Sequence, residues 1–218
     1  MRPSWPASVA LPGPDRPQTA PARRPFEIVA IAASAGGLQA LMAVLSTLPA
    51  TFGATVAVVQ HLDPRHRSLM PEIIGRRSAL PVHQATDGST VETGHVYIAP
   101  PDHHLLLNAG GIISLTHTEL VNFVRPSADL LFESVAAAYG ERAIAVVLTG
   151  TGRDGSMGVT AIKKRGGTVI VQDEASSDFF GMPSAAIRTG TVDFVLSLDE
   201  IPGALQTLLS GEGRELSP

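Results

Sequence analysis

Three side chains of the types that together can carry out nucleophilic hydrolysis stand at comparable places in this sequence. Ser34, His61 and Asp154 each follow a short run of apolar, partly β-branched residues. A serine hydroxyl attacks a carbonyl carbon when a histidine takes its proton and a carboxylate orients that histidine. The chain order Ser, His, Asp differs from the orders in the chymotrypsin, subtilisin and α/β-hydrolase folds. The three residues therefore indicate a hydrolase outside those groups.

The apolar runs that precede these residues predict buried parallel strands, because strands covered on both faces show no polar alternation. Four such strands are expected, at residues 28–33, 54–60, 143–148 and 168–172. In an open sheet of this kind the functional crevice lies outside the carboxyl ends of the strands. We therefore expect Ser34, His61 and Asp154 to meet at that edge.

Shorter elements complete the predicted fold. Short strands are expected at 82–85, 96–99 and 193–196, and a hairpin at 105–108 and 112–116 around Ala109-Gly110-Gly111. Helices are expected at 38–48, 68–76, 183–188 and 198–209. Two further helices are expected: one that begins after Ser127, its N-cap, and one that runs from the loop around Asp154 to about Arg165. This pattern predicts a doubly wound, mainly parallel α/β sheet flanked by helices, with an antiparallel hairpin at one edge.

The turn after the first strand has the strongest chemical character. Gly36 and Gly37 follow Ser34 closely, and Leu38 begins a helical repeat of apolar residues. Such a turn exposes a side chain and points free backbone N–H groups into the same space, which suits a nucleophile beside an oxyanion site. Ser34 also fits an N-cap, and the glycines also fit a phosphate cradle. The cradle lacks the spacing of the known nucleotide-binding loops.

Metal and cofactor sites are not expected. The loop around Asp154 also fits a metal or phosphate loop, but no second carboxylate stands at ligand spacing. His103 and His104 are adjacent, and on a strand they would face opposite ways, so they are not expected to share a metal. We interpret both as loop or rim residues.

Composition narrows the class further. The chain has 218 residues, enough for one α/β domain, and its 44% apolar content predicts a folded protein. The net charge of −4 gives no reason to expect nucleic acid or an anionic membrane surface as a partner. The absence of cysteine excludes disulfides and thiolate chemistry. No apolar run has transmembrane length and no signal-peptide pattern is present, so we expect no membrane insertion and a cytoplasmic protein.

The chain divides into three predicted parts. Residues 1–25 are rich in Pro and Arg and are expected to form a disordered extension, because they cannot bury enough apolar surface. Residues 26–209 are expected to form a single catalytic domain. Residues 210–218 are polar and are expected to form a flexible tail.

Several motifs occur together in a fixed order. They are IAASAGG at 31–37, Gln60-His61, IAPPDHHL at 98–105, RPSADLLF at 125–132, LTGTGRDGSMG at 148–158, QDE at 172–174 and GMP at 181–183. Together they resemble the catalytic domain of the chemotaxis methylesterase family (CheB, protein-glutamate methylesterase). The resemblance extends over residues 26–209.

The resemblance implies hydrolysis of γ-glutamyl methyl esters on the cytoplasmic helices of methyl-accepting chemoreceptors, with deamidation of receptor glutamines in some members. It implies that Ser34 is the nucleophile, His61 the general base and Asp154 the orienting carboxylate. Backbone N–H groups from Ala35 to Gly37 are expected to form part of the oxyanion site, with Ala35, Gly36, Gly37 and Thr151 at the substrate rim. The alternative is a non-catalytic docking module in a chemosensory assembly.

The sequence departs from the family pattern at three positions. Ala32 stands where the family has glycine, Ala35 where it has threonine, and Thr151 where it commonly has methionine. The family also usually carries a phosphoacceptor receiver domain ahead of the catalytic domain, and residues 1–25 are too few to form one. Control by phosphorylation of a receiver is therefore not expected for this chain.

Overall fold

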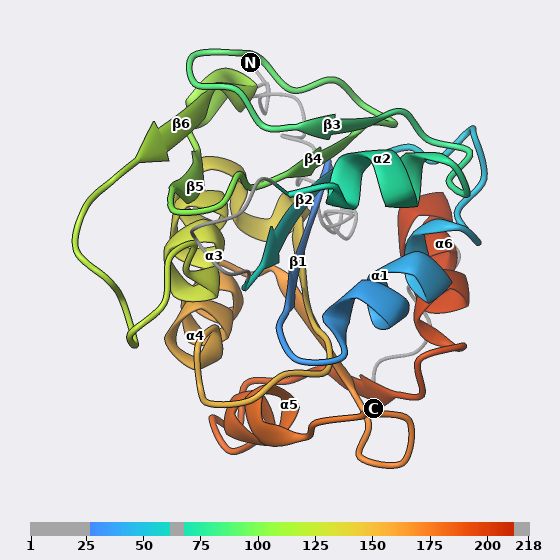
Figure 1. The fold of residues 1–218 in the computed structure, drawn as a ribbon. Helices are drawn as coiled ribbons and strands as arrows, with labels where there is room; N and C mark the ends of the chain where they lie inside the picture. Colours follow the sequence, from blue (N-terminus) through green and yellow to red (C-terminus); the bar gives the residue numbers. More distant parts are fainter. Residues whose placement is uncertain (1–26, 62–67, 212–218) are drawn as a thin grey trace, which may run out of the picture.

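A seven-stranded parallel sheet forms the centre of the computed structural model, which describes residues 27–61 and 68–211 (Figure 1). Its strand order is β3-β4-β2-β1-β7-β8-β9, and every recorded pairing within it is parallel. The strands are β1 (Ile28–Ala33), β2 (Thr55–Gln60), β3 (Val82–Gln84), β4 (Val96–Ile98), β7 (Ala143–Val147), β8 (Thr168–Gln172) and β9 (Phe194–Leu196). The predicted doubly wound α/β fold is confirmed.

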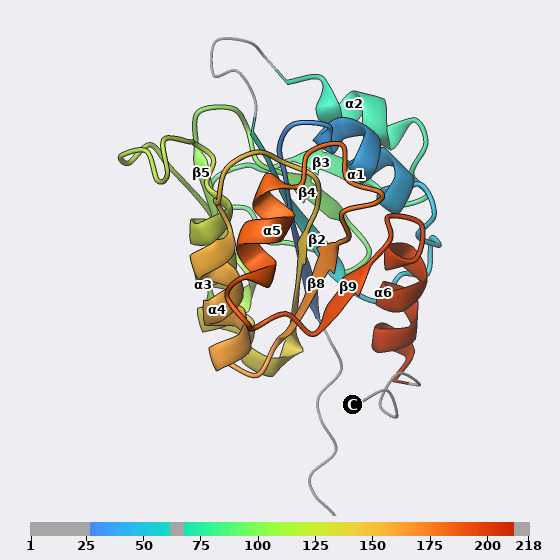
Figure 2. The same cartoon turned by 90° about the horizontal axis from the view of Figure 1, so that it is seen from below.

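Helices cover both faces of this sheet (Figure 2). One face carries α3 (Ala128–Tyr139), α4 (Ser156–Lys164) and α5 (Gly181–Ile187). The other carries α1 (Gly37–Leu45), α2 (Met70–Gly75) and α6 (Ile201–Ser210). The expected helices are all present, with ends displaced by a few residues. No helix in the described part of the chain has the length and hydropathy that a bilayer-spanning segment needs.

The predicted hairpin is present as β5 (His104–Leu107) and β6 (Ile113–Thr116), which pair antiparallel. A short 3₁₀ turn, Ala109–Gly111, joins the two strands. The pair forms its own two-stranded sheet, and Leu105 and Leu107 of β5 belong to the same apolar cluster as α3. The hairpin is thus attached to the domain by side-chain packing.

The predicted terminal segments lie mostly outside the described residues. This applies to the extension at 1–25 and to residues 212–218 of the tail. Within the described part, α6 continues to Ser210 and ends at Gly211, which has a positive φ of 78°. The last helix therefore extends slightly beyond the predicted domain boundary at residue 209.

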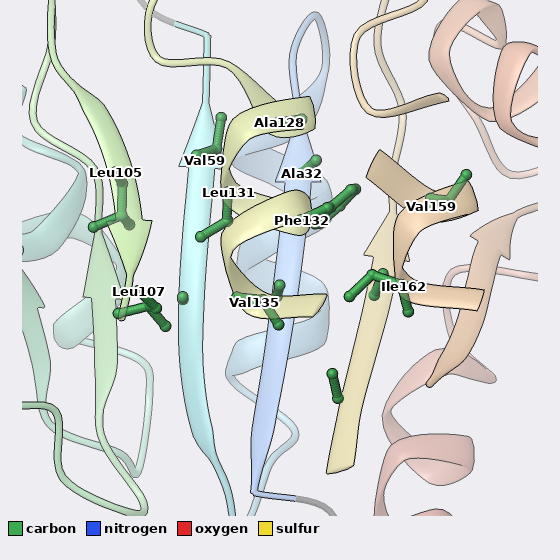
Figure 3. Packing of buried hydrophobic residues seen from close by; sticks show 14 of the residues in the cluster. Ala32, Val59, Leu105, Leu107, Ala128, Leu131, Phe132, Val135, Val159 and Ile162 are labelled. Carbon is green, nitrogen blue, oxygen red and sulfur yellow. The ribbon is translucent and has the colours of Figure 1, made fainter. Parts of the chain in front are cut away.

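Alternate residues of β1 supply the two halves of the core. Ala30 and Ala32 face α3, while Val29 and Ile31 face α1, and all of them are fully buried. The small β1 residues on the α3 side leave room for Phe132, which lies between β1 and α4 (Figure 3). Burying side chains of this size stabilises a fold by roughly 1.5–3 kcal/mol each.

Helices α3 and α4 approach each other closely at one glycine. A Cβ atom at Gly158 of α4 would lie only 2.6 Å from Phe132 Cβ and 3.0 Å from the Asp129 carbonyl oxygen. Only a residue without a side chain fits here, because real Cβ atoms do not approach other heavy atoms so closely. This contact brings the first turns of α3 and α4 together.

The strand order also decides which loops meet. From β1 the chain passes to β2, then to β3 at the edge of the sheet and back to β4 beside β2, and later returns to β7 on the opposite side of β1. The carboxyl ends of β2, β1 and β7 are therefore neighbours, and the switch point lies between β1 and β7. In open α/β sheets this is where binding crevices form.

The packing predicts a large cost for removing Phe132. Phe132→Ala should lower the free energy of unfolding by about 3–5 kcal/mol, because the cavity is enclosed by β1, α3 and α4. Val195→Ala, at a half-exposed position of the edge strand β9, should change it by less than about 0.5 kcal/mol. Urea denaturation of both variants measures this difference, and a loss below about 1 kcal/mol for Phe132→Ala would contradict the packing argument.

Candidate functional site

Ser34 is held at the carboxyl end of β1 by both neighbouring strands. Its N–H donates to the Thr149 carbonyl beyond β7 at 3.0 Å, and its carbonyl accepts from Gln60 Nε2, at the end of β2, at 2.7 Å. The N-cap of α1 is Gly36, which has a φ of 76°, so Ser34 is not the helix N-cap. Its half-buried side chain is therefore not engaged as a cap.

The glycines after Ser34 have different functions. The Gly37 N–H donates to the Ser34 carbonyl at 2.8 Å, so this group is already used within the turn. A Cβ at Gly37 would lie 2.0 Å from Gln60 Oε1, so only glycine fits there. Among the described residues, the N–H groups of Ala35 and Gly36 have no hydrogen-bond partner. Of the three predicted oxyanion donors, these two remain available.

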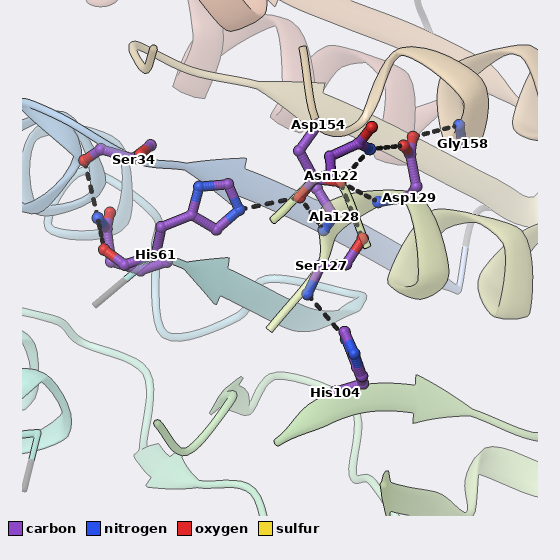
Figure 4. A network of polar contacts seen from close by, with 10 residues as sticks. Ser34, His61, His104, Asn122, Ser127, Ala128, Asp129, Asp154 and Gly158 are labelled. Carbon is purple, nitrogen blue, oxygen red and sulfur yellow. Dashed lines mark hydrogen bonds and ion pairs between the residues drawn. The ribbon is translucent and has the colours of Figure 1, made fainter. Parts of the chain in front are cut away.

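His61 lies beside Ser34 and points its ring toward Asp154 (Figure 4). Its Nε2 is 2.9 Å from Asp154 Oδ2, and the two side chains are only 12% and 3% exposed. An ionised carboxylate only accepts hydrogen bonds, so Nε2 carries the proton. The other ring nitrogen, Nδ1, then has its lone pair free and no partner among the described residues.

The Ser34 hydroxyl and the His61 ring do not hydrogen-bond in this conformation, judged over the described part of the chain. Catalytic hydrogen bonds are often long or misaligned before substrate binds. A rotation about the Ser34 Cα–Cβ bond, through staggered positions that serine adopts freely, reorients this hydroxyl. The structure thus brings together all three predicted residues, without a hydrogen bond between the Ser34 hydroxyl and the His61 ring among the described residues.

The Asp154 carboxylate lies at the N-terminus of α3. It accepts from the backbone N–H of Ala128 at 2.5 Å and of Asp129 at 3.3 Å, and from the Ser127 hydroxyl at 2.8 Å. Ser127 is the N-cap residue, as predicted, but its hydroxyl donates to Asp154 and does not cap its own helix. Free N–H groups of a helix N-terminus stabilise negative charge.

These contacts keep Asp154 ionised. Burial alone would raise its pKa, but hydrogen bonds from the His61 ring, the Ala128 N–H and the Ser127 hydroxyl outweigh burial and hold the pKa below its usual range. The ionised carboxylate accepts from Nε2–H and so leaves the lone pair of Nδ1 available. The pair is therefore suited to accept a proton at Nδ1.

The expectation that His104 is a loop or rim residue is wrong. His104 begins β5 and is fully buried. Its Nε2 donates to the Glu119 carbonyl at 3.0 Å, and its Nδ1 accepts from the Ser127 N–H at 3.1 Å. It therefore positions the residue that hydrogen-bonds Asp154. The signal was present, because adjacent histidines on a strand face opposite ways and one of them must face inward.

Sequence reasoning also missed the buried polar side chains that fix the loops. Gln60 Nε2 bonds both Ser34 and His61 through their carbonyls, at 2.7 and 3.0 Å. The Thr149 hydroxyl donates to the Ala35 carbonyl at 3.1 Å, while Gln172 Oε1 accepts from the Thr149 N–H at 2.8 Å. Gln60 and Gln172 lie within the motifs Gln60-His61 and QDE described above, and these motifs were the signal in the sequence for their structural role.

The three departures from the family pattern lie in different surroundings. Ala32 is fully buried in the core cluster beneath α3 and does not line the site. Ala35 is half-buried beside Ser34, and Thr151 is exposed. Of these three residues, only Ala35 and Thr151 are therefore accessible from the surface.

A parallel sheet with a serine turn and a buried histidine–carboxylate pair at its switch point is typical of α/β hydrolytic enzymes. The family model described as CheB methylesterase matches residues 29–205. The chain belongs to the CheB methylesterase family.

Solved and curated relatives agree with this assignment. The crystal structure of the Thermotoga maritima CheB methylesterase catalytic domain superposes with a TM-score of 0.81 at 39% identity, covering 84% of this chain and 98% of that one. A protein-glutamate methylesterase/protein-glutamine glutaminase 2 of Anaeromyxobacter dehalogenans is 45% identical over 89% of this chain and 57% of its own length. A protein-glutamate methylesterase/protein-glutamine glutaminase of Pyrococcus abyssi is 42% identical over 80% of this chain and 48% of its own length. The chain thus spans about half the length of these two relatives.

The burial of His104 predicts a loss of stability in acid. Burial lowers its pKa, with Arg125 and His117 also disfavouring the charged ring, while the Glu119 carbonyl and Asp154 oppose the shift. Below the unfolded pKa of about 6.5, the unfolded chain binds a proton that the folded chain excludes, so the free energy of unfolding falls as pH drops. The fall continues down to the folded pKa of His104.

His104→Asn tests this account, because the Asn carbonyl can still accept from the Ser127 N–H. The variant should be less stable than wild type at neutral pH by about 1–3 kcal/mol, since the bond to Glu119 is lost. Its stability should depend less on pH below about 6.5 than that of wild type. Urea denaturation across this range measures both effects, with the exposed His83→Asn as control. Equal pH dependence in wild type and His104→Asn would refute the prediction.

Proposed function

We propose that this protein is a serine hydrolase that removes methyl esters from glutamate side chains of methyl-accepting chemoreceptors, and that it also deamidates receptor glutamines. The observation that carries the proposal is the 2.9 Å pair of His61 Nε2 and Asp154 Oδ2, buried beside Ser34 at the switch point. The names of the relatives support both activities. They support an enzyme and not the alternative of a non-catalytic docking module.

In the first half-reaction Ser34 Oγ attacks the ester carbonyl and gives its proton to His61 Nδ1. The tetrahedral intermediate then collapses, the C–O bond to the methoxy group breaks, and the proton on Nδ1 passes to the leaving oxygen. Methanol departs and a glutamyl ester of Ser34 remains. Asp154 stabilises the imidazolium throughout, because its ionised carboxylate holds Nε2–H.

In the second half-reaction water replaces the alcohol. His61 takes a proton from water, the hydroxide attacks the acyl carbon, and the Ser34–acyl bond breaks as the proton returns to Oγ. The product is a free glutamate side chain. With a glutamine substrate the same steps release ammonia in place of methanol.

The developing oxyanion is assigned to the N–H groups of Ala35 and Gly36. Both have no hydrogen-bond partner among the described residues, and both precede the first turn of α1. Preorganised donors of this kind typically contribute a factor of about 10²–10³ to kcat each. The Gly37 N–H is assigned a structural role, because it already binds the Ser34 carbonyl.

The assigned partner is a cytoplasmic receptor helix, and the assigned compartment is the cytoplasm. Large apolar side chains are exposed on segments next to those that carry the site: Met157, in the first turn of α4, is 66% exposed, and Phe179 and Phe123, on loops, are 46% and 94% exposed. Exposed apolar side chains around a reactive serine suit the apolar stripe of an amphipathic helix. The exposed Arg153, next to Asp154, suits an acidic, glutamate-rich segment.

Ser34→Ala should abolish ester hydrolysis and leave the fold intact, because it removes the attacking atom without changing the turn. Loss of a triad nucleophile typically lowers kcat by several orders of magnitude. Methanol release from methylated receptor fragments measures the effect, and circular dichroism checks the fold. Retention of more than about a tenth of wild-type turnover would exclude Ser34 as nucleophile.

Asp154→Asn should cost far more activity than stability. An Asn amide can donate to Nε2 and so favour the tautomer with Nδ1 protonated, which cannot accept the Ser34 proton; the known precedent in another triad is a loss of about 10⁴ in kcat. The free energy of unfolding should fall by only about 1–3 kcal/mol, since the Asn oxygen still accepts from α3. Asp193→Asn, the same change at a carboxylate that binds Lys163 and the Val169 N–H, is the matched control. An Asp154→Asn variant as active as Asp193→Asn would refute the assigned role.

A further inference from the structure

Helices α3 and α4 cap each other's N-termini through two aspartates. Asp154 stands just before α4, and its carboxylate accepts from the first N–H groups of α3. Asp129 lies in the first turn of α3, and its Oδ1 accepts from the Gly158 N–H in the first turn of α4 at 2.8 Å. Each carboxylate thus accepts hydrogen bonds from backbone N–H groups at the start of the other helix, which have no acceptor within that helix. The arrangement places two buried carboxylates close together.

One amide lies between these carboxylates (Figure 4). Asn122 Nδ2 donates to Asp129 Oδ2 at 2.8 Å and to Asp154 Oδ1 at 3.3 Å. Both hydrogens of the amide are therefore used, one for each carboxylate. The amide oxygen accepts from Arg153 Nε at 3.3 Å.

The backbone holds Asn122 in place for this contact. Val121 and Val124 exchange N–H···O bonds of 3.2 and 3.0 Å, which closes a tight turn. Asn122 has a φ of 50° within it, in the left-handed region that few residues other than Gly and Asn adopt readily. Asparagine is thus a residue that fits both the turn and the two acceptors.

Two like charges in a buried site repel each other, and each must be stabilised by donors. Burial raises the pKa of Asp129, and the neighbouring Asp154 raises it further, while Gly158 and Asn122 oppose the shift. Asp154 Oδ1 accepts from the Ser127 hydroxyl, the Asn122 amide and the Asp129 N–H, while Oδ2 accepts from the Ala128 N–H and the His61 ring. Without the amide, Oδ1 loses a donor and faces Asp129 with less compensation.

We propose that Asn122 is a positioning residue for the hydrolytic site: its amide bridges Asp129 and Asp154 and so fixes the rotation of the Asp154 carboxylate that presents Oδ2 to His61. This inference rests on the proposed hydrolase function. Asn122 touches no reacting atom, and its effect reaches Ser34 only through Asp154 and His61. It should therefore affect kcat and leave KM largely unchanged.

Asn122→Gly removes the amide and keeps the turn, because glycine adopts a positive φ without strain. The loss of a hydrogen bond to a charged group should lower kcat for methylated receptor fragments about tenfold, with KM within about twofold of wild type. The rate at which a fluorophosphonate probe modifies Ser34 should fall by the same factor. The downfield proton NMR signal of His61 Nε2–H should shift or broaden, which a purely structural role of Asn122 would not cause.

Asn108→Gly is the matched control. Its amide also bridges two acceptors, the Ile112 carbonyl and the Ser114 hydroxyl, but lies in the hairpin away from the site. It should have wild-type kcat, probe rate and His61 signal. If Asn122→Gly does not fold, Asn122→Asp has nearly the same size and replaces the donor by an acceptor, and it should reduce kcat more strongly than tenfold.

Rates within about twofold of wild type in the folded Asn122 variant, with an unchanged His61 signal, would overturn the inference. The proposed function fails in a different way: wild type would then release no methanol or ammonia from receptor fragments. The fluorophosphonate rate and the His61 signal still test Asn122 in that case, because neither requires the natural substrate.

Discussion

The site depends on one buried negative charge, the carboxylate of Asp154. Taking a carboxylate out of water costs several kcal/mol unless donors surround it. Here the donors come from the N-terminus of α3, the Ser127 hydroxyl, the Asn122 amide and the His61 ring. The helix contributes the backbone N–H groups of Ala128 and Asp129, which have no acceptor within the helix. The orientation of His61 follows from where α3 begins.

Because of this dependence, the packing of the core affects the geometry of the site. The position of the α3 N-terminus is set by Phe132, which packs on the small residues of β1, and by Gly158, which lets α4 approach. A change in that packing would move the N–H groups that hold Asp154. The residues that stabilise the fold on this face therefore also determine the geometry of the proposed triad.

The loops at the carboxyl edge of the sheet have no regular secondary structure, and hydrogen bonds from buried side chains hold their backbones in place. Backbone groups in a buried loop need partners, and here Gln60, Thr149 and Gln172 provide them. Gln60 also joins the backbones of the proposed nucleophile and general base. Such a rigid edge suits acyl transfer, which requires reacting atoms to be held in line.

The sequence by itself determined the parallel sheet, the order of its elements and the loops that carry Ser34, His61 and Asp154. These follow from local signals: continuous apolar runs for buried strands, helical spacing for the crossovers and glycines at the turns. The carboxyl ends of parallel strands share one edge, so the meeting of the three residues was also predictable.

Tertiary structure decided what local patterns do not encode. The burial of His104, the bridging amide of Asn122 and the mutual capping by Asp129 and Asp154 join residues distant in sequence. The use of the Gly37 N–H within the turn is likewise not encoded in the local pattern. Hydrogen-bond partners and burial depend on which helices pack together, and that is settled only when the whole chain folds.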